Sequence, residues 1–283
     1  MVSRRGVLRG GAAAVLGAAA AGCLSQTDRA PAARPVRHDY GQDPSQYAEL
    51  TLPAGEGPFP VVVVVHGGFW RSAYDLSLGR PLAEDLAGRG YAVWNLEYRR
   101  VGNGGGWPAT FTDVAAGIDL LAGLDAPLDL DTVLGLGHSA GGHLAVWAAA
   151  RPGLPPETPG AAPVVALTAV LSQAGVLDLR RAAEEQLGAG ATQEFLGGSP
   201  AEQPQRYTVA SPVQRVPLGV PVVCVHGRAD TNVPVSQSRS YVEAATAAGD
   251  QAELIEVDGD HFVVIEVGSL AWREIVDQLR RLR

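Results

Sequence analysis

Ser139 is the residue whose surroundings most clearly suggest chemistry. It lies in the segment Gly-His-Ser-Ala-Gly (137–141), between the apolar run Val133–Leu136 and the alanine-rich stretch Leu144–Ala150. This pattern predicts a strand, a sharp turn and a helix, which would present the serine hydroxyl above a sheet. Glycines two residues before and after the serine let the strand and the helix approach closely. The helix N-terminus favours developing negative charge. The segment therefore predicts a serine nucleophile.

A serine hydroxyl needs a general base, and that base needs an orienting carboxylate. Ligands of open α/β sheets bind at the carboxyl ends of strands, so both partners should follow strands. Asp230 lies in the loop after the apolar run Val220–Val225, and His261 follows the predicted strand Glu253–Val257. We therefore expect His261 to be the base and Asp230 the orienting acid, in the chain order Ser, Asp, His.

Two other carboxylates compete with Asp230 for this role. Asp258 and Asp260 are close neighbours of His261 in the chain, and we expect them to shape its turn instead. The remaining histidines of the predicted turns are expected to form structural hydrogen bonds and not to act as bases: His66, His138, His143 and His226.

A tetrahedral intermediate needs N–H donors directed at its oxyanion. The backbone amide of Ala140, directly after the nucleophile, is the first expected donor. The second should come from Gly68 or Phe69, in the glycine-rich turn His66–Trp70 that follows five consecutive valines, Val61–Val65. We therefore predict an oxyanion hole between these two turns.

Strands alternate with helical segments along the chain, which predicts a doubly wound, mostly parallel sheet of the α/β class. The first strand is expected over Gln46–Leu52, at an edge of the sheet. A long insertion, roughly 172–216, interrupts the alternation, with Leu177–Leu187 helical and the rest a loop. Hydrophobic residues make up 46% of the 283 residues, which suits one large domain over 45–283.

The first 22 residues are expected to be an export signal. Arg4-Arg5 resembles a twin-arginine signal, and the apolar stretch after it is too short to span a bilayer. Ala-Gly-Cys at 21–23 resembles a bacterial lipobox, which would leave Cys23 lipidated and the protein anchored outside the cytoplasmic membrane. An ordinary secretory signal is the alternative. Residues 23–44 are expected to be a linker, and Cys224 a core residue.

Together these segments resemble the α/β-hydrolase superfamily of serine esterases. The turn His-Gly-Gly-Phe-Trp (66–70) and the segment Asp-His-Phe (260–262), with Ile265-Glu266, are most similar to the arylformamidase (kynurenine formamidase) and carboxylesterase branch. The resemblance implies a small helical lid over Leu177–Pro212. It also implies a substrate pocket shaped by Phe69, Trp70 and Tyr98. We also place His138 at this pocket.

The leading hypothesis is a serine hydrolase of small carboxylic esters or activated amides that works through an acyl-enzyme. The alternatives are an arylformamidase and a small peptidase of the prolyl-oligopeptidase kind. No metal or cofactor is predicted, since no His/Cys cluster with ligand spacing occurs in the sequence. The net charge of −8 argues against nucleic acid as a partner. A membrane partner is expected only through the lipid at Cys23.

Overall fold

The five valines Val61–Val65 lie at the centre of a sheet that is covered on both faces. The structure, a computed structural model, describes residues 33–283. The valines belong to β3 (Phe59–Val65), which pairs in parallel with β4 on one side and β5 on the other. Alternate valines enter two different hydrophobic clusters, one on each face. A strand without polar alternation is therefore buried on both sides, as the sequence predicts.

The strands form one sheet in the order β1-β2-β4-β3-β5-β6-β7-β8. The first three strands in this order pair antiparallel, and the others pair in parallel. The bounds are β1 (Val36–Asp39), β2 (Tyr47–Thr51), β3 (Phe59–Val65), β4 (Ala92–Leu96), β5 (Leu128–His138), β6 (Ala169–Gln173), β7 (Val222–Gly227) and β8 (Ala252–Val257).

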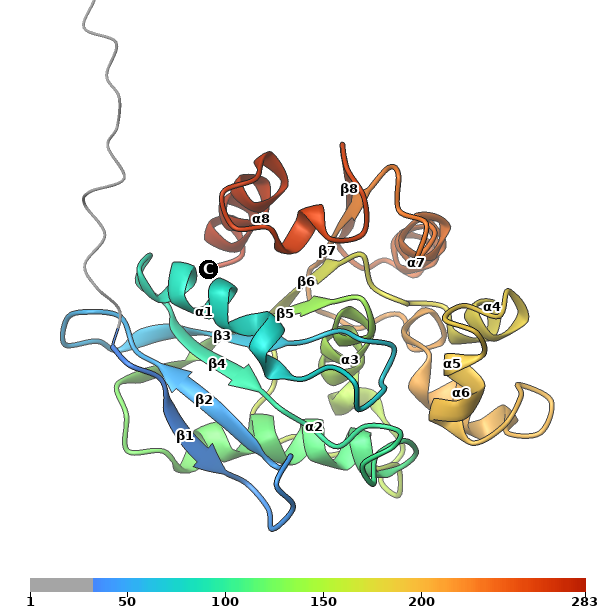
Figure 1. Cartoon of the computed structure of the whole chain (residues 1–283), viewed down its shortest axis with the longest axis horizontal. Helices are drawn as coiled ribbons and strands as arrows, with labels where there is room; N and C mark the ends of the chain where they lie inside the picture. The colour runs from blue at the N-terminus through green and yellow to red at the C-terminus, as the bar shows by residue number, and fades with distance from the viewer. Residues whose placement is uncertain (1–32) are drawn as a thin grey trace, which may run out of the picture.

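Helices lie on both faces of this sheet (Figure 1). Side chains of α1 and α8 pack in one hydrophobic cluster, and those of α2, α3 and α7 pack in the other. The bounds are α1 (Arg80–Ala87), α2 (Ala109–Asp119), α3 (Ala140–Ala149), α4 (Leu179–Glu184), α5 (Ala191–Leu196), α6 (Pro204–Ala210), α7 (Ser236–Ala247) and α8 (Leu270–Arg281). This is the α/β-hydrolase fold.

Local signals fix where several of these helices begin. Ser269 precedes α8, and its hydroxyl accepts a hydrogen bond from the amide of Trp272 at 2.9 Å. Asp178 precedes α4 and accepts from the amide of Arg181 at 3.2 Å. Such N-caps satisfy amides that the first helical turn leaves without partners. No helix within residues 33–283 is both long and apolar enough to cross a membrane.

Two expectations about the chain's organisation need correction. The linker predicted over 23–44 includes β1 (Val36–Asp39), which pairs with β2 and takes the sheet edge that was assigned to Gln46–Leu52. The insertion between β6 and β7 holds three short helices, α4 to α6, where one was expected. These helices gather at the right of Figure 1, at the carboxyl end of β6. The predicted signal and the first part of the linker lie outside the described residues.

Candidate active site

Ser139 occupies a strained turn between β5 and α3. Its backbone has φ 55° and ψ −119°, outside the conformations that residues other than glycine usually adopt. A Cβ on Gly137 would overlap the carbonyl oxygen of Gly141, so this close approach of strand and helix requires glycine. The Ser139 amide donates to the carbonyl oxygen of Gln173 at 2.8 Å, which ties the turn to the end of β6. The strand, turn and helix predicted around Ser139 are present.

Asp230 and His261 come from the loops after β7 and β8 and meet at the carboxyl end of the sheet. Their Oδ2 and Nδ1 atoms are 2.6 Å apart. The other oxygen of Asp230, Oδ1, accepts from the amides of Asn232 and Val233, both at 2.9 Å. His226 Nε2 lies 3.2 Å from Asp230 Oδ2. The buried carboxylate is therefore held at both oxygens, and Nδ1 of His261 is engaged, which leaves Nε2 able to take a proton.

Hydrogen bonds keep Asp230 ionised in a buried position. Burial alone would raise the pKa of the Asp230 carboxyl, because it penalises the charged form. The hydrogen bonds from His226, His261 and the Val233 amide outweigh burial, and the net effect lowers the pKa of Asp230. A carboxylate that stays charged can stabilise an imidazolium on His261.

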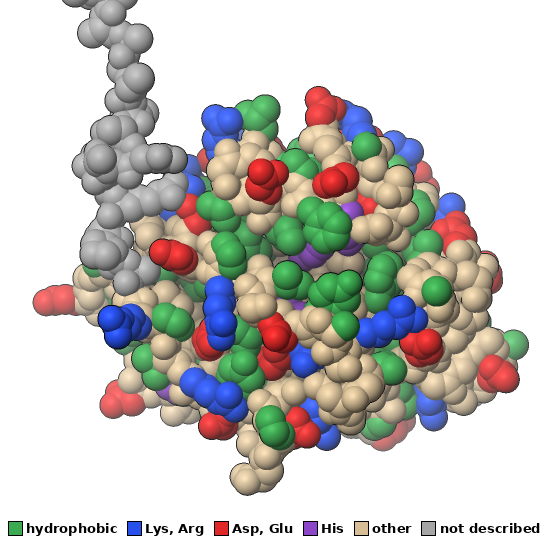
Figure 2. Space-filling view, viewed as in Figure 1, with side chains coloured by type: hydrophobic (Ala, Val, Ile, Leu, Met, Phe, Trp, Pro, Cys, Tyr) green, Lys and Arg blue, Asp and Glu red, His purple; other side chains and the backbone are tan. Residues whose placement is uncertain are grey.

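Ser139 and His261 line the same small cavity, of about 100 Å³. Most of the atoms around it are apolar. Its lining residues are Gly68, Phe69, Tyr74, Leu78, His138, Ser139, Asn232, His261, Phe262 and Ile265. On the face drawn in Figure 2, histidine atoms are visible in a depression bordered by hydrophobic side chains. The structure thus brings the predicted nucleophile and base to one cavity, with Asp230 bound to His261.

The predicted oxyanion turn lies against the nucleophile. A Cβ on Gly67 would come within 2.8 Å of the His138 carbonyl oxygen and 3.0 Å of Ser139 Cβ. Gly68 and Phe69 line the cavity, and within residues 33–283 their amides donate to no protein acceptor. Ala140 is the first residue of α3, so its amide has no partner inside the helix. All three proposed donors are therefore free to bind a negatively charged oxygen.

A buried charge network lies behind this turn and was not foreseen from the sequence. Glu97, directly after β4, pairs with Arg100 and lies 3.2 Å from His66 Nε2. It also accepts from the amides of Leu76 and Tyr98, both at 2.9 Å. The other ring nitrogen of His66, Nδ1, bonds the carbonyl oxygen of Gly67 at 2.8 Å. The sequence does contain a signal for this network: Glu97 directly follows a buried strand, and a buried carboxylate requires partners.

Trp70 and Tyr98 do not line the cavity, contrary to the expectation from the resemblance. Both are fully buried. Trp70 has φ 54°, and its indole packs in the core, where Nε1 donates to His143 Nδ1 at 3.2 Å. The Tyr98 hydroxyl donates to the His66 carbonyl oxygen at 2.7 Å, and its ring stacks on that of His66. These two residues therefore pack behind the predicted oxyanion turn, outside the lining of the cavity. Phe69 and His138 do line the cavity.

Five lining residues were not assigned to the pocket from the sequence: Tyr74, Leu78, Asn232, Phe262 and Ile265. Phe262 directly follows the base, and Asn232 follows the acid by two positions, so proximity to the triad was a usable signal for both. Tyr74 and Leu78 come from the segment before α1, and nothing in their local pattern distinguishes them from core residues. The insertion 172–216, expected as a lid, supplies none of the described lining residues.

The rival carboxylates have other partners. Asp258 is almost fully exposed and binds Arg228 at 2.5 Å. Asp260 accepts from the amides of Phe262 and Val263, at 2.9 and 3.2 Å, and so shapes the turn that carries His261. In the structure it is Asp230, and neither of these rivals, that is bonded to the His261 ring.

Three of the other histidines are buried and held neutral. Burial lowers the pKa of His66 and of His138 to about 3, and that of His143 to about 4. His143 Nε2 bonds the Ala210 carbonyl at 2.9 Å, and His138 Nε2 bonds the His261 carbonyl at 2.9 Å. A neutral imidazole can donate through one nitrogen and accept through the other. The rings of His138 and His143 therefore each link distant segments of the chain, and all three rings form structural hydrogen bonds, as expected.

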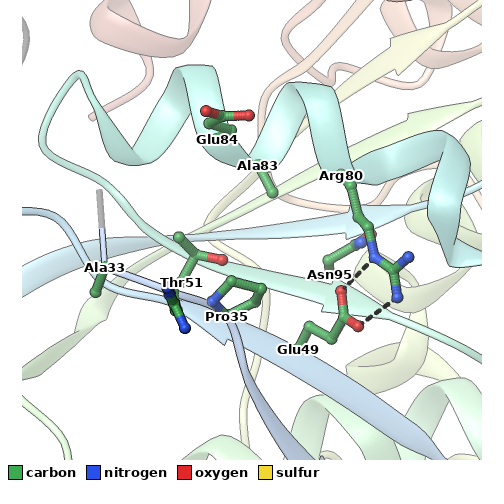
Figure 3. A pocket seen from close by; sticks show the side chains of 9 residues that line it. Ala33, Pro35, Glu49, Thr51, Arg80, Ala83, Glu84 and Asn95 are labelled. Atoms are coloured by element: carbon green, nitrogen blue, oxygen red, sulfur yellow. Dashed lines mark hydrogen bonds and ion pairs between the residues drawn. The ribbon is translucent and has the colours of Figure 1, made fainter. Parts of the chain in front are cut away.

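A larger cavity, of about 390 Å³, lies between β2, β4 and α1 (Figure 3). Arg80 makes two hydrogen bonds to Glu49 at its wall, at 2.9 and 2.7 Å. Among the described residues that line it there is no serine, cysteine or histidine. Since acyl transfer requires a nucleophile and a base, volume alone does not identify the active site. The smaller cavity at Ser139 is the candidate.

Comparison with known proteins agrees with this geometry. Residues 49–244 match the BD-FAE family. Esterase LipC of Mycobacterium tuberculosis is 29% identical over 78% of the chain and 57% of its own length. The chain spans about half the length of the curated relatives it matches.

Solved structures share the fold over almost the whole described chain. Esterase B from Lactobacillus rhamnosis aligns with a TM-score of 0.77 and 24% identity, over 90% of this chain and 86% of its own. The propionate-bound esterase Est2 of Thermogutta terrifontis aligns with a TM-score of 0.69 and 25% identity, over 87% of this chain and 92% of its own.

Proposed function

The chain belongs to the BD-FAE family, and we propose that it is a serine carboxylesterase that hydrolyses small esters. The observation that carries the proposal is the 2.6 Å bond between Asp230 and His261, with His261 and Ser139 on the wall of one cavity. Esterases among its relatives support the same reaction class.

In this mechanism Ser139 Oγ attacks the ester carbonyl carbon while its proton passes to His261 Nε2. The carbonyl oxygen becomes an oxyanion, bound by the amide of Ala140 and by an amide of Gly68 or Phe69. The bond to the leaving alcohol then breaks, and the alcohol takes the proton from His261. Water then attacks the acyl-enzyme carbonyl carbon while His261 takes its proton; the bond to Ser139 Oγ breaks, Oγ takes that proton back from His261, and the acid is released. Asp230 stabilises the charged His261 in both halves.

The size of the cavity favours short acyl groups. Sites for drug-sized ligands are typically about 300–1,000 Å³, whereas this cavity is about 100 Å³. Its lining is mainly apolar, so an uncharged acyl group fits better than a charged one. The similar Thermogutta esterase has been solved with propionate bound, which is the anion of a short-chain acid.

An arylformamidase is the second candidate, and the rim of the cavity favours it. The exposed side chains of Tyr74 and Phe262 border the opening, at 49% and 55% exposure. An aromatic leaving group could stack on such rings. Formyl is also the smallest acyl group, which fits the small cavity.

Activity-based labelling combined with a substrate series tests the proposal. A fluorophosphonate should label the wild type once and should leave Ser139→Ala unlabelled. Among p-nitrophenyl esters, kcat/KM should be highest for acetate to butyrate and should fall for longer chains. N-formylkynurenine and a peptide amide, assayed alongside, separate the two alternative activities. Labelling that persists in Ser139→Ala would exclude Ser139 as the nucleophile.

We also propose that the protein is exported and anchored through Cys23. The proposal depends on the order of Arg4-Arg5, a short apolar stretch and Ala-Gly-Cys in the sequence, which lies outside the described residues. A diacyl-type anchor suffices for stable attachment where one short chain is marginal. In a bacterial host the protein should fractionate with membranes, and Cys23→Ser should release it or leave it unprocessed. Full-length protein with Met1 in the cytoplasm would contradict export.

A further inference from the structure

The proposed oxyanion turn is packed directly against the helical insertion between β6 and β7. The ring of Phe69 lies so close to Gly188 that a Cβ on this glycine would come within 2.6 Å of it. The indole of Trp70 stacks on the ring of Phe195, with centroids 4.6 Å apart and planes inclined by 7°. Two consecutive residues of the turn therefore each rest on the insertion.

Arg71, the next residue, adds a polar contact to the same segment. Its Nε donates to Glu194 Oε2 at 2.9 Å, and its guanidinium also reaches the Ala189 carbonyl oxygen at 3.4 Å. Three residues in a row thus bind a stretch of the chain more than a hundred positions away. Such a concentration of contacts indicates that the two segments hold each other in place.

Both segments have a strained backbone. In the turn, φ is positive at Gly68, Phe69 and Trp70, at 115°, 49° and 54°. In the insertion it is positive at Gln186, Gly188, Ala189 and Gly190, at 54°, 60°, 55° and 81°. Residues other than glycine remain in this region only where their surroundings over-determine them, and such strain gathers at functional sites. The contacts between the two segments supply that constraint.

The insertion is itself anchored to the core and is not a loose flap. Phe195 is fully buried, and its carbonyl oxygen accepts from the Trp107 amide at 2.8 Å. His143, on the helix that follows the nucleophile, bridges Trp70 Nε1 and the Ala210 carbonyl oxygen. The insertion therefore connects the oxyanion turn to the helix behind Ser139.

We propose that the insertion fixes the position of the oxyanion amides, with Gly188 and Phe195 as positioning residues. This inference rests on the proposed function, because it assigns the amides of Gly68 and Phe69 to transition-state binding. The insertion then acts on the rate of the chemical step from behind the turn. It does not cover the substrate as a lid would.

Two glycines of the insertion provide a matched test. Gly188→Ala places a methyl group against the Phe69 ring and should push the turn out of position. Gly190→Ala imposes a similar backbone strain at φ 81°, but its Cβ would meet only the ends of two glutamine side chains, Gln193 at 3.3 Å and Gln186 at 3.6 Å. Both variants should lose stability from the backbone strain, and Gly188→Ala should lose more because of the added overlap with Phe69. Gly188→Ala should lower kcat roughly 10- to 100-fold with KM little changed, because displacing an oxyanion donor should cost less than removing one, which lowers kcat about 10²- to 10³-fold. Gly190→Ala should keep kcat within about two-fold.

A second pair of variants tests Phe195 by conservative rescue. Phe195→Leu removes the stacking partner of Trp70 and should lower kcat, whereas Phe195→Tyr keeps the ring and should restore most of it. The rate of fluorophosphonate labelling of Ser139 is measured in every variant. The kcat values are compared at a temperature at which both glycine variants are folded. If the wild type labels and the two variants have equal kcat, the inference is overturned and the proposed function stands. A wild type that neither labels nor hydrolyses any ester would overturn the proposed function and the inference with it.

Discussion

His261, the proposed base, and the proposed oxyanion turn both border the cavity, but different interactions hold them. His261 is fixed by hydrogen bonds between two loops that are about thirty residues apart in the chain, at the ends of neighbouring strands. The turn at 68–70 is held by packing against residues 188–195 and by a buried charge network. The proposed acid–base side is thus held by polar contacts between loops at the ends of strands, whereas the proposed oxyanion side depends on packing against the insertion and on strained backbone.

Substitutions on the two sides of the cavity should therefore affect rate and stability differently. A substitution on the acid–base side should remove a chemical group and leave the fold intact. A substitution on the oxyanion side should alter stability and rate together, because the contacts that we propose to position the amides also belong to the packed core.

Asp230→Asn should have the largest effect on the rate. Asparagine keeps the shape but cannot stabilise a charged His261, and the equivalent loss in a serine protease lowers kcat about 10⁴-fold. We expect a loss of kcat of roughly 10³- to 10⁴-fold with folded protein. Asp258→Asn and Asp260→Asn are the controls, and each should retain most of the activity. A greater loss in either control would show that Asp230 is not the acid.

Glu97→Gln should have the largest effect on stability. Removing the charge leaves the buried Arg100 without its partner, and breaking a buried pair in this way typically costs about 3–5 kcal/mol. The control is Glu49→Gln, whose partner Arg80 is mostly exposed, so its loss should be at most about 1 kcal/mol. Urea unfolding of the two variants measures the difference. Equal losses would mean that the Glu97 network does not stabilise the turn.

The same contrast explains what the sequence could predict. Ser139, Asp230 and His261 each follow an apolar strand, and parallel strands bring their carboxyl ends together. Their meeting at one cavity needs no knowledge of distant contacts.

Trp70 was misplaced because its direction depends on a positive φ and on Phe195, which nothing in the turn's own sequence specifies. β1 was missed since its four residues are largely exposed and show no alternation. The helices α4 to α6 are too short for a clear period.

Acid should destabilise the oxyanion side through its buried histidines. Burial lowers the pKa of His143 to about 4, against an unfolded value of about 6.5. The unfolded state therefore binds the proton first. The stability from neutral His143 is complete above pH ~6.5 and falls as the pH drops toward 4, by about 2 kcal/mol at pH 5. Between pH 7.5 and 5, the free energy of unfolding of the wild type should therefore fall by about 2 kcal/mol more than that of His143→Gln. An unchanged pH dependence would contradict a neutral, buried His143.

The ion pair between Arg71 and Glu194 gives the smallest expected effect, and it allows a change in rate to be distinguished from a change in stability. Glu194 pairs with Arg71 of the oxyanion side, whereas Glu185 pairs with Arg181 on α4, away from the turn. Both pairs are partly exposed, and each should contribute at most about 1 kcal/mol to stability. Glu194→Gln and Glu185→Gln should therefore lower the melting temperature by the same small amount. Only Glu194→Gln removes a contact that orients the backbone next to Phe69, so it alone should lower kcat, by roughly two- to five-fold, with KM unchanged. Equal kcat in the two variants would show that the packing of Phe69 and Trp70 suffices to hold the turn, without the ion pair.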